Sequence, residues 1–298
     1  MFQKVKRYLT SPYYALGDDM IVKHPEWMSD KYFIRVFWKR MMGYPLDLKH
    51  PKTFNEKLQW MKLYDRNPMY PILVDKVKVK EWVAERIGRQ YVIPTLAVYD
   101  SAEEIDLQTL PEQFVLKCNH DSGGVIICKD KSSFNMEEAR SVLTKRLEHD
   151  FYQEYREWPY KMVERKILAE QFISDGESAD LPDYKVFTFG GEPKLIQVDF
   201  DRFSGHKRNI YDISWNLLDA RIQFPPQKDR IFEKPECLDE LLALSRALSK
   251  GLRQVRTDFY IIRNRIFFGE MTLFHGAGTE RFTPAELGLE MGSWIDLT

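Results

Sequence analysis

The spacing of apolar residues predicts helices in the first third of the chain. Apolar side chains recur there at the three- and four-residue intervals of an amphipathic helix. The predicted helices span residues 26–43, 53–64 and 75–87. The second opens with Thr53-Phe54-Asn55-Glu56, which has the pattern of a capping box, and the third is followed by Gly88, a residue typical of helix ends. Only one strand, 92–99, is predicted before residue 110, so this part is expected to be helix-rich.

From residue 111 onward, short apolar runs bounded by Gly, Asp and Asn predict strands. Residues 114–128 have the pattern of a hairpin, and further strands are predicted at 166–173, 184–189, 194–200, 255–262 and 265–272. The Gly190-Gly191 pair predicts a tight turn between two of them. Helices are predicted at 134–149, with Asn135 as its cap, and at 236–251. Residues 174–182 are expected to form a polar loop and 201–209 a basic loop. The fold class is therefore α+β, with mostly antiparallel sheet.

Composition narrows the class of protein. The chain has 298 residues, 44% of them hydrophobic, and a net charge of -1, so it can fill a core and lacks the basic excess of a nucleic-acid binder. Its three cysteines have no metal-ligand spacing and favour a reducing compartment, the cytoplasm. Cys118 and Cys128 are expected in the core.

The sequence also bears on membranes. No apolar run approaches the roughly 20 residues needed to span a bilayer, and the N-terminus lacks the features of a signal peptide. Residues 1–9 mix basic and apolar side chains, which leaves open a peripheral association with the inner face of the membrane. A packing helix is the favoured interpretation of this segment. The pattern predicts no particular oligomeric state.

The segment Phe114–Cys128 carries the first candidate chemistry. Lys117 ends one apolar run, and the turn that follows contains Ser122-Gly123-Gly124. Glycines let backbone N–H groups approach an anion closely, and a lysine beside such a turn can bind phosphate. The segment by itself is equally compatible with an ordinary hairpin whose lysine is solvated.

Charged residues also interrupt apolar strands further along the chain, where they are costly without partners. They are Lys117, Glu170, Lys185, Asp258 and Glu270. Each of them alone is explained by an exposed strand face. Together, lysines that neutralise phosphate and carboxylates that hold Mg²⁺ suit a polyphosphate site, and Asp258 and Glu270 fall on the two strands of one predicted hairpin.

This order of residues resembles the ATP-grasp superfamily and, more narrowly, the TupA-like ATP-grasp group. The resemblance extends from the segment Lys52–Trp60 to Gly292-Ser293-Trp294-Ile295. Its most specific pieces are Phe114–His120, Leu181–Lys185, His206–Asn209 and Phe268–Thr272. It implies a helix-rich region (1–110), a small subdomain with the glycine-rich flap (111–174) and a large subdomain with the metal and acceptor loops (175–298). Two α+β subdomains would clamp ATP between their sheets.

The resemblance implies an ATP-dependent carboxylate–amine ligase that works through an acyl phosphate. TupA-like proteins are linked to teichuronopeptide and related polymers, so an amino acid joined to a uronic acid or to a cell-surface polysaccharide is the expected product. The implied cofactors are ATP and Mg²⁺, and the implied partner is a small molecule or saccharide.

The resemblance also assigns roles to residues. Lys117 and Lys185 would contact phosphates, Ser122, Gly123 and Gly124 would form the flap, Glu170 would contact the ribose, and Gln171, Phe172 and Ile173 would pack on the adenine. Asp258 and Glu270 would hold Mg²⁺, joined by Thr272, which stands where many members have Asn. Lys207 and Arg208, with Arg202 in the same loop, would neutralise the γ-phosphate and the transition state. His275, Gly276 and Gly278 would contact the acceptor.

Four expectations remain open from the sequence. A glycosyltransferase would use an Asp-x-Asp metal motif, and Asp199-Phe200-Asp201 offers one. A small-molecule kinase would phosphorylate a hydroxyl on the same scaffold. A nucleotide-binding pseudoenzyme is favoured only by Thr272. Finally, Asp75-Lys76 is expected to begin a helix; related folds place a lysine here near the nucleotide or the second substrate, but an exposed lysine on the helix surface is the favoured interpretation.

Overall fold

Two antiparallel sheets organise the chain. The computed structural model describes residues 12–176, 181–202 and 205–298. The smaller sheet has the strand order β1-β4-β2-β3, and its strands are β1 (Thr95–Tyr99), β2 (Phe114–Cys118), β3 (Ile126–Cys128) and β4 (Ile167–Gln171). The larger has the order β10-β9-β5-β6-β7, from β5 (Asp183–Phe189), β6 (Glu192–Phe200), β7 (Lys207–Asp212), β9 (Gln254–Ile262) and β10 (Arg265–Thr272). β8 (Arg221–Ile222) pairs with β11 (Phe282–Thr283).

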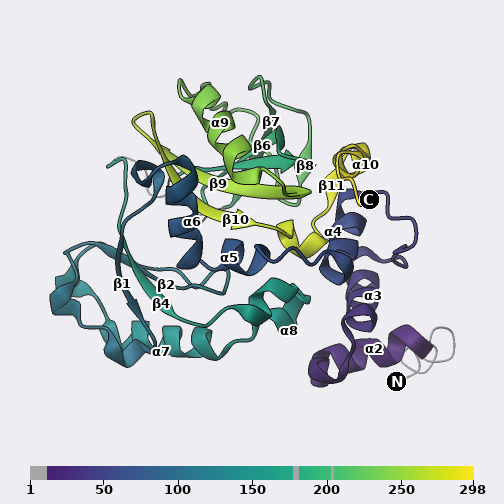
Figure 1. The fold of residues 1–298 in the computed structure, drawn as a ribbon, viewed down its shortest axis with the longest axis horizontal. Helices are drawn as coiled ribbons and strands as arrows, with labels where there is room; N and C mark the ends of the chain where they lie inside the picture. Colours follow the sequence, from purple (N-terminus) through teal and green to yellow (C-terminus); the bar gives the residue numbers. More distant parts are fainter. Residues whose placement is uncertain (1–11, 177–180, 203–204) are drawn as a thin grey trace.

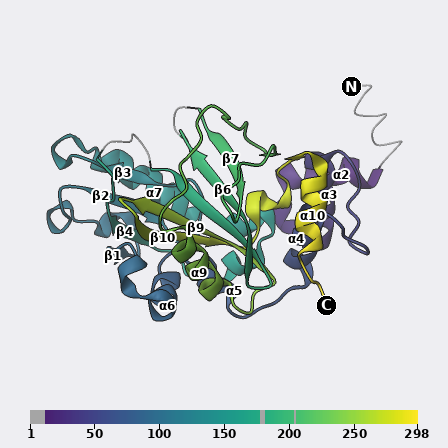
Figure 2. The same ribbon diagram turned by 90° about the horizontal axis from the view of Figure 1, so that it is seen from above.

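Helices cover these sheets. They are α2 (Pro12–Lys23), α3 (Asp30–Met42), α4 (Phe54–Tyr64), α5 (Tyr70–Val74), α6 (Lys78–Ile87), α7 (Met136–Glu148), α8 (Phe151–Tyr155), α9 (Leu238–Ser249) and α10 (Ala285–Ser293). Figure 1 shows the two sheets as separate layers with α5 and α6 between them. Figure 2 shows the smaller sheet and α7 at one end of the molecule and α2, α3 and α10 at the other. The predicted α+β class is confirmed.

Local signals in the sequence predict several element boundaries correctly. Thr53 Oγ1 accepts a hydrogen bond from Glu56 N (3.2 Å), and Glu56 Oε2 accepts one from Thr53 N (2.9 Å), so the capping box forms. Asn135 caps α7 by accepting from Glu138 N. The Gly190-Gly191 pair joins β5 to β6, and both glycines have positive φ. These motifs act within a few residues, which is why the sequence alone reveals them.

The apolar residues form three clusters. The largest lies between the five-stranded sheet and helices α4, α5, α6, α9 and α10. A second fills the space between the smaller sheet and α7, and it contains Cys118 and Cys128, as expected. A third holds α2 and α3 together. The large core therefore fixes one wall of the space between the sheets, and the small core fixes the other.

Two expectations about individual segments can be compared with the structure. The basic loop expected at 201–209 is wrong in its last part, because residues 207–212 form β7 and pair with β6. The strand predicted near 92–99 forms β1, which pairs with β4, so the smaller sheet takes a strand from before residue 111. Pairing between strands that lie far apart in the sequence cannot be predicted from local patterns.

Some expectations fall on residues outside the described ranges. They concern residues 1–9 as a membrane-facing segment, residues 177–180 of the polar loop and residues 203–204 of the basic loop. Among the described residues, no helix combines the length and the apolar character that crossing a bilayer requires.

Candidate active site

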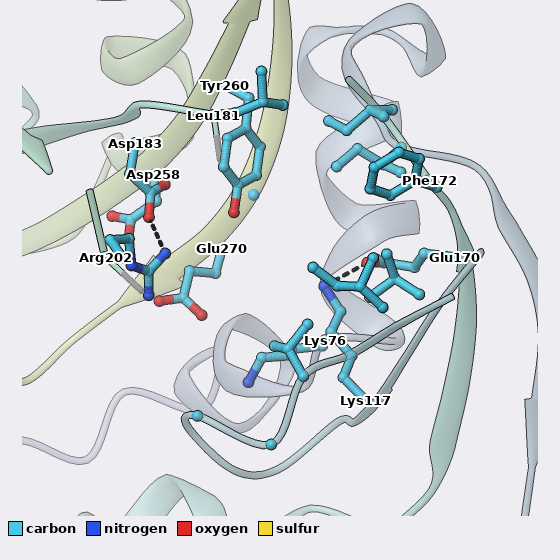
Figure 3. A pocket seen from close by; sticks show the side chains of 18 of the residues that line it. Lys76, Lys117, Glu170, Phe172, Leu181, Asp183, Arg202, Asp258, Tyr260 and Glu270 are labelled. Carbon is cyan, nitrogen blue, oxygen red and sulfur yellow. Dashed lines mark hydrogen bonds and ion pairs between the residues drawn. The ribbon is translucent and has the colours of Figure 1, made fainter. Parts of the chain in front are cut away.

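A cavity of about 300 Å³ lies between the two sheets, and residues from both line it. Figure 3 shows Lys117 and Glu170 of the smaller sheet facing Asp258 and Glu270 of the larger one. Twelve of the residues singled out in the sequence line this cavity: Lys117, Ser122, Gly123, Gly124, Glu170, Gln171, Phe172, Ile173, Lys185, Arg202, Asp258 and Glu270. They come from segments up to 153 residues apart, so the fold brings them together.

Glu170 holds two lysines at the small-sheet wall. Its carboxylate lies 2.5 Å from Nζ of Lys117 and 2.5 Å from Nζ of Lys80. Burial opposes ionisation of Glu170, but the two lysines outweigh it and lower its pKa. Lys80 also donates to the carbonyl of Ile93 (2.8 Å), which anchors α6 to the chain before β1. Sequence reasoning missed Lys80, because its approach to Glu170 depends on how α6 packs against β4.

The turn between β2 and β3 covers one side of the cavity. Ser122 and Gly123 are exposed, and Gly123 has φ +84°, a conformation that favours glycine. A Cβ on Gly124 would lie 2.6 Å from Asp121 Oδ2, so any other residue here would displace the Asp121 carboxylate. The two glycines therefore shape the flap: Gly123 has a backbone conformation that favours glycine, and Gly124 leaves room for the Asp121 carboxylate.

Lys76 is a cavity residue, which corrects the expectation of an exposed helical lysine. Helix α6 begins at Lys78, and Lys76 lies in the turn before it, where its Nζ donates to the carbonyl of Asp121 at the base of the flap. Lys76 lines the cavity together with Lys117 (Figure 3). Two lysine side chains from different elements therefore face the same space.

A β-bulge places Asp258 and Glu270 side by side, and we call this pair the acidic wall of the cavity. Phe268 pairs with Phe259 in the core, Glu270 pairs with Asp258, and Gly269 between them has no partner. The extra residue reverses the alternation of β10, so that Glu270 lies beside Asp258 instead of facing the core. The cross-strand neighbours predicted from the hairpin are thus adjacent.

Lysine and arginine side chains surround Asp258. Nζ of Lys185 lies 2.5 Å from Oδ2 of Asp258 and 2.9 Å from Oδ2 of Asp183. Arg202, from the segment after β6, binds Asp183 at 2.6 Å. Burial opposes ionisation of Glu270, but Lys76, Lys185 and other cations outweigh it and lower its pKa to about 2. Glu270 therefore faces the cavity as a carboxylate.

Arg256 joins the residues of the acidic wall, and the sequence reasoning missed it. Its Nε and Nη2 bind the two oxygens of Asp258 at 2.7 and 2.8 Å, and Nη2 lies 3.0 Å from Thr272 Oγ1 and 3.4 Å from Glu270 Oε1. One signal could have found it: Arg256 stands two residues before Asp258, and residues i and i+2 of a strand share a face.

An apolar region closes the other end of the cavity. Figure 3 shows Phe172 across the space from Leu181 and Tyr260. Phe172 and Ile173 follow β4, whereas Tyr260 lies on β9, so the two sheets supply opposite sides of a slot. An aromatic ring between apolar walls is favourable. Tyr260 and Leu181 were not among the predicted site residues.

The other predicted site residues do not line this cavity. Arg208 on β7 is buried, with Nε and Nη2 on Asp199 at 2.6 and 3.1 Å and Nη1 on Glu280 at 2.6 Å. Lys207 is half-buried on the same strand. Since Asp199 is held by Arg208 and is 2% exposed, the Asp-x-Asp motif of the glycosyltransferase alternative does not present a metal site.

The acceptor loop also packs away from the cavity. His275 is 1% exposed, and Gly276 and Gly278 have positive φ. Gln59 of α4 donates to the carbonyls of Ala277 and Gly278, each at 2.9 Å, and Lys62 donates to the former at 2.9 Å. Thr272, which precedes this loop, does not line the cavity, but its Oγ1 contacts Arg256 (3.0 Å) and Glu270 (3.3 Å).

Comparison with known proteins identifies the family. The sequence matches the family described as TupA-like ATP-grasp over residues 56–296. The chain belongs to this family. Its members are ATP-dependent ligases. None of the curated proteins matches the chain.

Solved structures that match this ATP-grasp chain include three ligases or synthetases. D-alanine–D-alanine ligase from Bacillus anthracis, complexed with ATP, is 17% identical, with 68% of this chain and 54% of that chain covered and a TM-score of 0.40. The corresponding enzyme from Helicobacter pylori is 17% identical, with 81% and 69% covered and a TM-score of 0.43. N5-carboxyaminoimidazole synthetase from Staphylococcus aureus, complexed with ADP, is 13% identical, with 68% and 45% covered and a TM-score of 0.41. The chain spans about half the length of the first of these structures.

The donor groups of this ATP-grasp chain fit Mg²⁺ with a polyphosphate. Glu270 is 40% exposed at its side chain, and its contacts with Arg256 (3.4 Å) and Thr272 (3.3 Å) are long, so its oxygens have room for a cation. Among the described residues, no group of three or more His, Cys, Asp and Glu side chains surrounds a common point. Mg²⁺ is commonly held by one or two carboxylates and completed by water and phosphate oxygens. Glu270 matches that donor set, whereas both oxygens of Asp258 are bound by Arg256 and Lys185, so Asp258 would have to release one of them to a metal ion.

Proposed function

We propose that this protein is an ATP-dependent carboxylate–amine ligase. The observation that carries the proposal is the single cavity in which Lys76 and Lys117 from one side face Lys185, Asp258 and Glu270 from the other. Cations that bind phosphate and carboxylates that bind Mg²⁺ are the groups that phosphoryl transfer requires, and the protein needs no nucleophile of its own. Membership of a family of ATP-dependent ligases supports the same reaction class.

The reaction has two steps. An oxygen of the substrate carboxylate attacks the γ-phosphorus, the bond to the ADP oxygen breaks, and an acyl phosphate and ADP result. The nitrogen of an amine then attacks the carbonyl carbon, the C–O bond to phosphate breaks, the nitrogen loses a proton, and an amide and inorganic phosphate are released. Bound Mg²⁺ supplies neutralisation of phosphate charge.

The residues of the cavity divide the work. Lys76, Lys117 and Lys185 bind phosphate oxygens, the flap at Ser122–Gly124 excludes water, and the slot between Phe172 and Tyr260 takes the adenine. Glu170 keeps Lys117 oriented and contacts the ribose, with Gln171 and Ile173 beside the base. Asp258 and Glu270 hold the metal ion, with the Thr272 hydroxyl as a weaker third ligand.

Two arginines are placed to bind developing negative charge. Arg202 lines the cavity and Arg256 spans its acidic wall, and a guanidinium suits the planar, bidentate contact that a carboxylate or phosphoryl group offers. Arg202 thus keeps the role that the sequence suggested for it, and Arg256 takes the role suggested for Arg208 and Lys207. Contact of His275, Gly276 and Gly278 with the acceptor stays a prediction.

The substrates follow from the family alone. In this proposal the enzyme joins an amino acid to a uronic acid or to a growing cell-surface polysaccharide. Membership of the TupA-like family supports this choice of substrates.

The reaction is tested with hydroxylamine as the amine. Purified protein is incubated with ATP, Mg²⁺, hydroxylamine and a panel of uronic and amino acids, and ADP and acyl hydroxamate are measured. Hydroxamate formation that matches ADP release supports the acyl phosphate. ADP release with a phosphorylated hydroxyl and no hydroxamate would make the protein a kinase, and no ADP release with well-folded protein would refute the proposal. Lys117→Met should abolish turnover, whereas Lys145→Met, at an exposed position on α7, should not.

A further inference from the structure

A line of buried polar side chains leads from the acidic wall of the cavity into the large core. Arg256 Nη1 lies 2.5 Å from Nδ1 of His275, and Nε2 of His275 lies 2.8 Å from Oε2 of Glu280. The Glu280 carboxylate in turn accepts a hydrogen bond from Nη1 of Arg208 (2.6 Å), and Arg208 binds Asp199 through two further nitrogens. None of the steps described above uses this line of contacts.

The contacts define the state of the His275 ring. A guanidinium can only donate hydrogen bonds, so Nδ1 of His275 must accept, and the ring proton is on Nε2. Nε2 lies 2.8 Å from Oε2 of Glu280, but without the alignment of a hydrogen bond. Burial lowers the pKa of His275, which keeps the ring neutral.

Packing holds the ring in this place. It contacts Phe187 edge to face, with ring centroids 5.0 Å apart, and Phe54 at 6.4 Å. The residues after it are fixed to α4, because Gln59 donates to two of their carbonyls and a Cβ on Gly278 would lie 2.5 Å from the Gln59 amide. Nδ1 is therefore a rigid acceptor.

We propose that His275 is a positioning residue that sets the guanidinium of Arg256 across Asp258, Glu270 and Thr272. The imidazole takes one terminal nitrogen of Arg256, which leaves Nε and Nη2 to face the acidic wall. Asp258 already holds Nε and Nη2 (2.7 and 2.8 Å), and His275 fixes the remaining terminal nitrogen, Nη1, so that the whole guanidinium has one orientation. Residues that contact the substrate commonly need rigid neighbours that fix their orientation.

This inference rests on the proposed function. The ring is 1% exposed and does not line the cavity, so its effect on the reaction passes through Arg256. Because the interaction matters when charge develops on the transferred phosphoryl group, its loss should lower kcat more than it raises KM for ATP.

The test compares His275→Leu with His275→Asn. Leucine removes the acceptor, whereas the amide oxygen of asparagine can reach the position of Nδ1. We expect Leu to lower kcat about 30-fold with KM for ATP changed less than about threefold, as the loss of a charge-assisted hydrogen bond implies, and Asn to recover most of the loss. His50→Asn, at an exposed site, is the control.

A double-variant cycle separates positioning from a general structural effect. In the Arg256→Ala background, His275→Leu should cause no further loss of kcat. An equal loss in both backgrounds would overturn the inference, as would a rise in KM with kcat unchanged. If the leucine variant does not fold, His275→Ala, which also removes the acceptor, takes its place in the same cycle, and full additivity there would overturn the inference.

Different results would refute the proposed function and the role of His275. Absence of hydroxamate formation by the unsubstituted protein would refute the ligase reaction. Normal turnover by His275→Leu, together with loss of turnover in Arg256→Ala, would refute only the role of His275.

Discussion

Asp258 and Glu270 are direct cross-strand partners because Gly269 adds one residue to β10. In a regular ladder Glu270 would lie opposite Thr257, which is buried in the core. The bulge therefore creates the acidic wall of the cavity, and a carboxylate pair that would repel itself is stabilised by Lys185 and Arg256.

Glu270→Gln tests the wall directly. The amide keeps the shape of the side chain and removes the charge that holds Mg²⁺, so we expect turnover to fall about 100-fold and half-saturation by Mg²⁺ to move to higher concentration. ADP release is measured over a Mg²⁺ titration. Glu286→Gln, exposed on α10, serves as the control and should behave as the unsubstituted protein. An unchanged Mg²⁺ titration for Glu270→Gln would argue against metal binding here.

Lys185→Met should destabilise the fold. Lys185 is 5% exposed and pairs with Asp183 and Asp258, so its loss leaves buried carboxylates with less compensation. We expect the free energy of unfolding to fall by about 3 kcal/mol, measured by urea denaturation. Adding Asp183→Asn should restore part of that stability but not ATP turnover. Equal stability of the single and double variants would contradict this account.

Thr272→Asn should tighten metal binding. Asn presents an amide oxygen, a better ligand for Mg²⁺ than a hydroxyl, and it can still accept the hydrogen bond that Arg256 Nη2 gives to Thr272 Oγ1. Half-saturation by Mg²⁺ should fall severalfold at saturating ATP. An unchanged concentration of Mg²⁺ at half-saturation would exclude Thr272 as a ligand.

Protonation of Glu280 should make the fold less stable in acid. Burial opposes its ionisation, but its neighbours, among them Arg208 at 2.6 Å, outweigh burial and lower its pKa from 4.5 to about 2. The stabilisation is present above pH 4.5 and is lost as the pH falls from there through 2, because the unfolded chain takes up the proton first. The shift corresponds to about 3 kcal/mol.

Urea denaturation between pH 6 and pH 3 measures this contribution. Glu280→Gln should be less stable than the unsubstituted protein at pH 6, and the difference should shrink toward pH 3. A difference that stays constant with pH would show that Glu280 does not titrate in this way.

The sequence by itself determined what acts within a few residues. Thr53 and Glu56 cap a helix, Gly190 and Gly191 turn a hairpin, and alternation of apolar residues predicts most strands. It also placed charged residues such as Lys117 and Glu270 inside apolar strands, which pointed to a common site because isolated charges there are costly.

The tertiary structure alone decided which of those charges meet. Lys80 reaches Glu170 through the packing of α6, and Arg256 and His275 join through the path of the loop after β10. The bulge at Gly269 is set by pairing with β9, and the burial of Arg208 by pairing of β7 with β6. Contacts between distant segments depend on the closure of the whole chain, and local patterns carry no record of them.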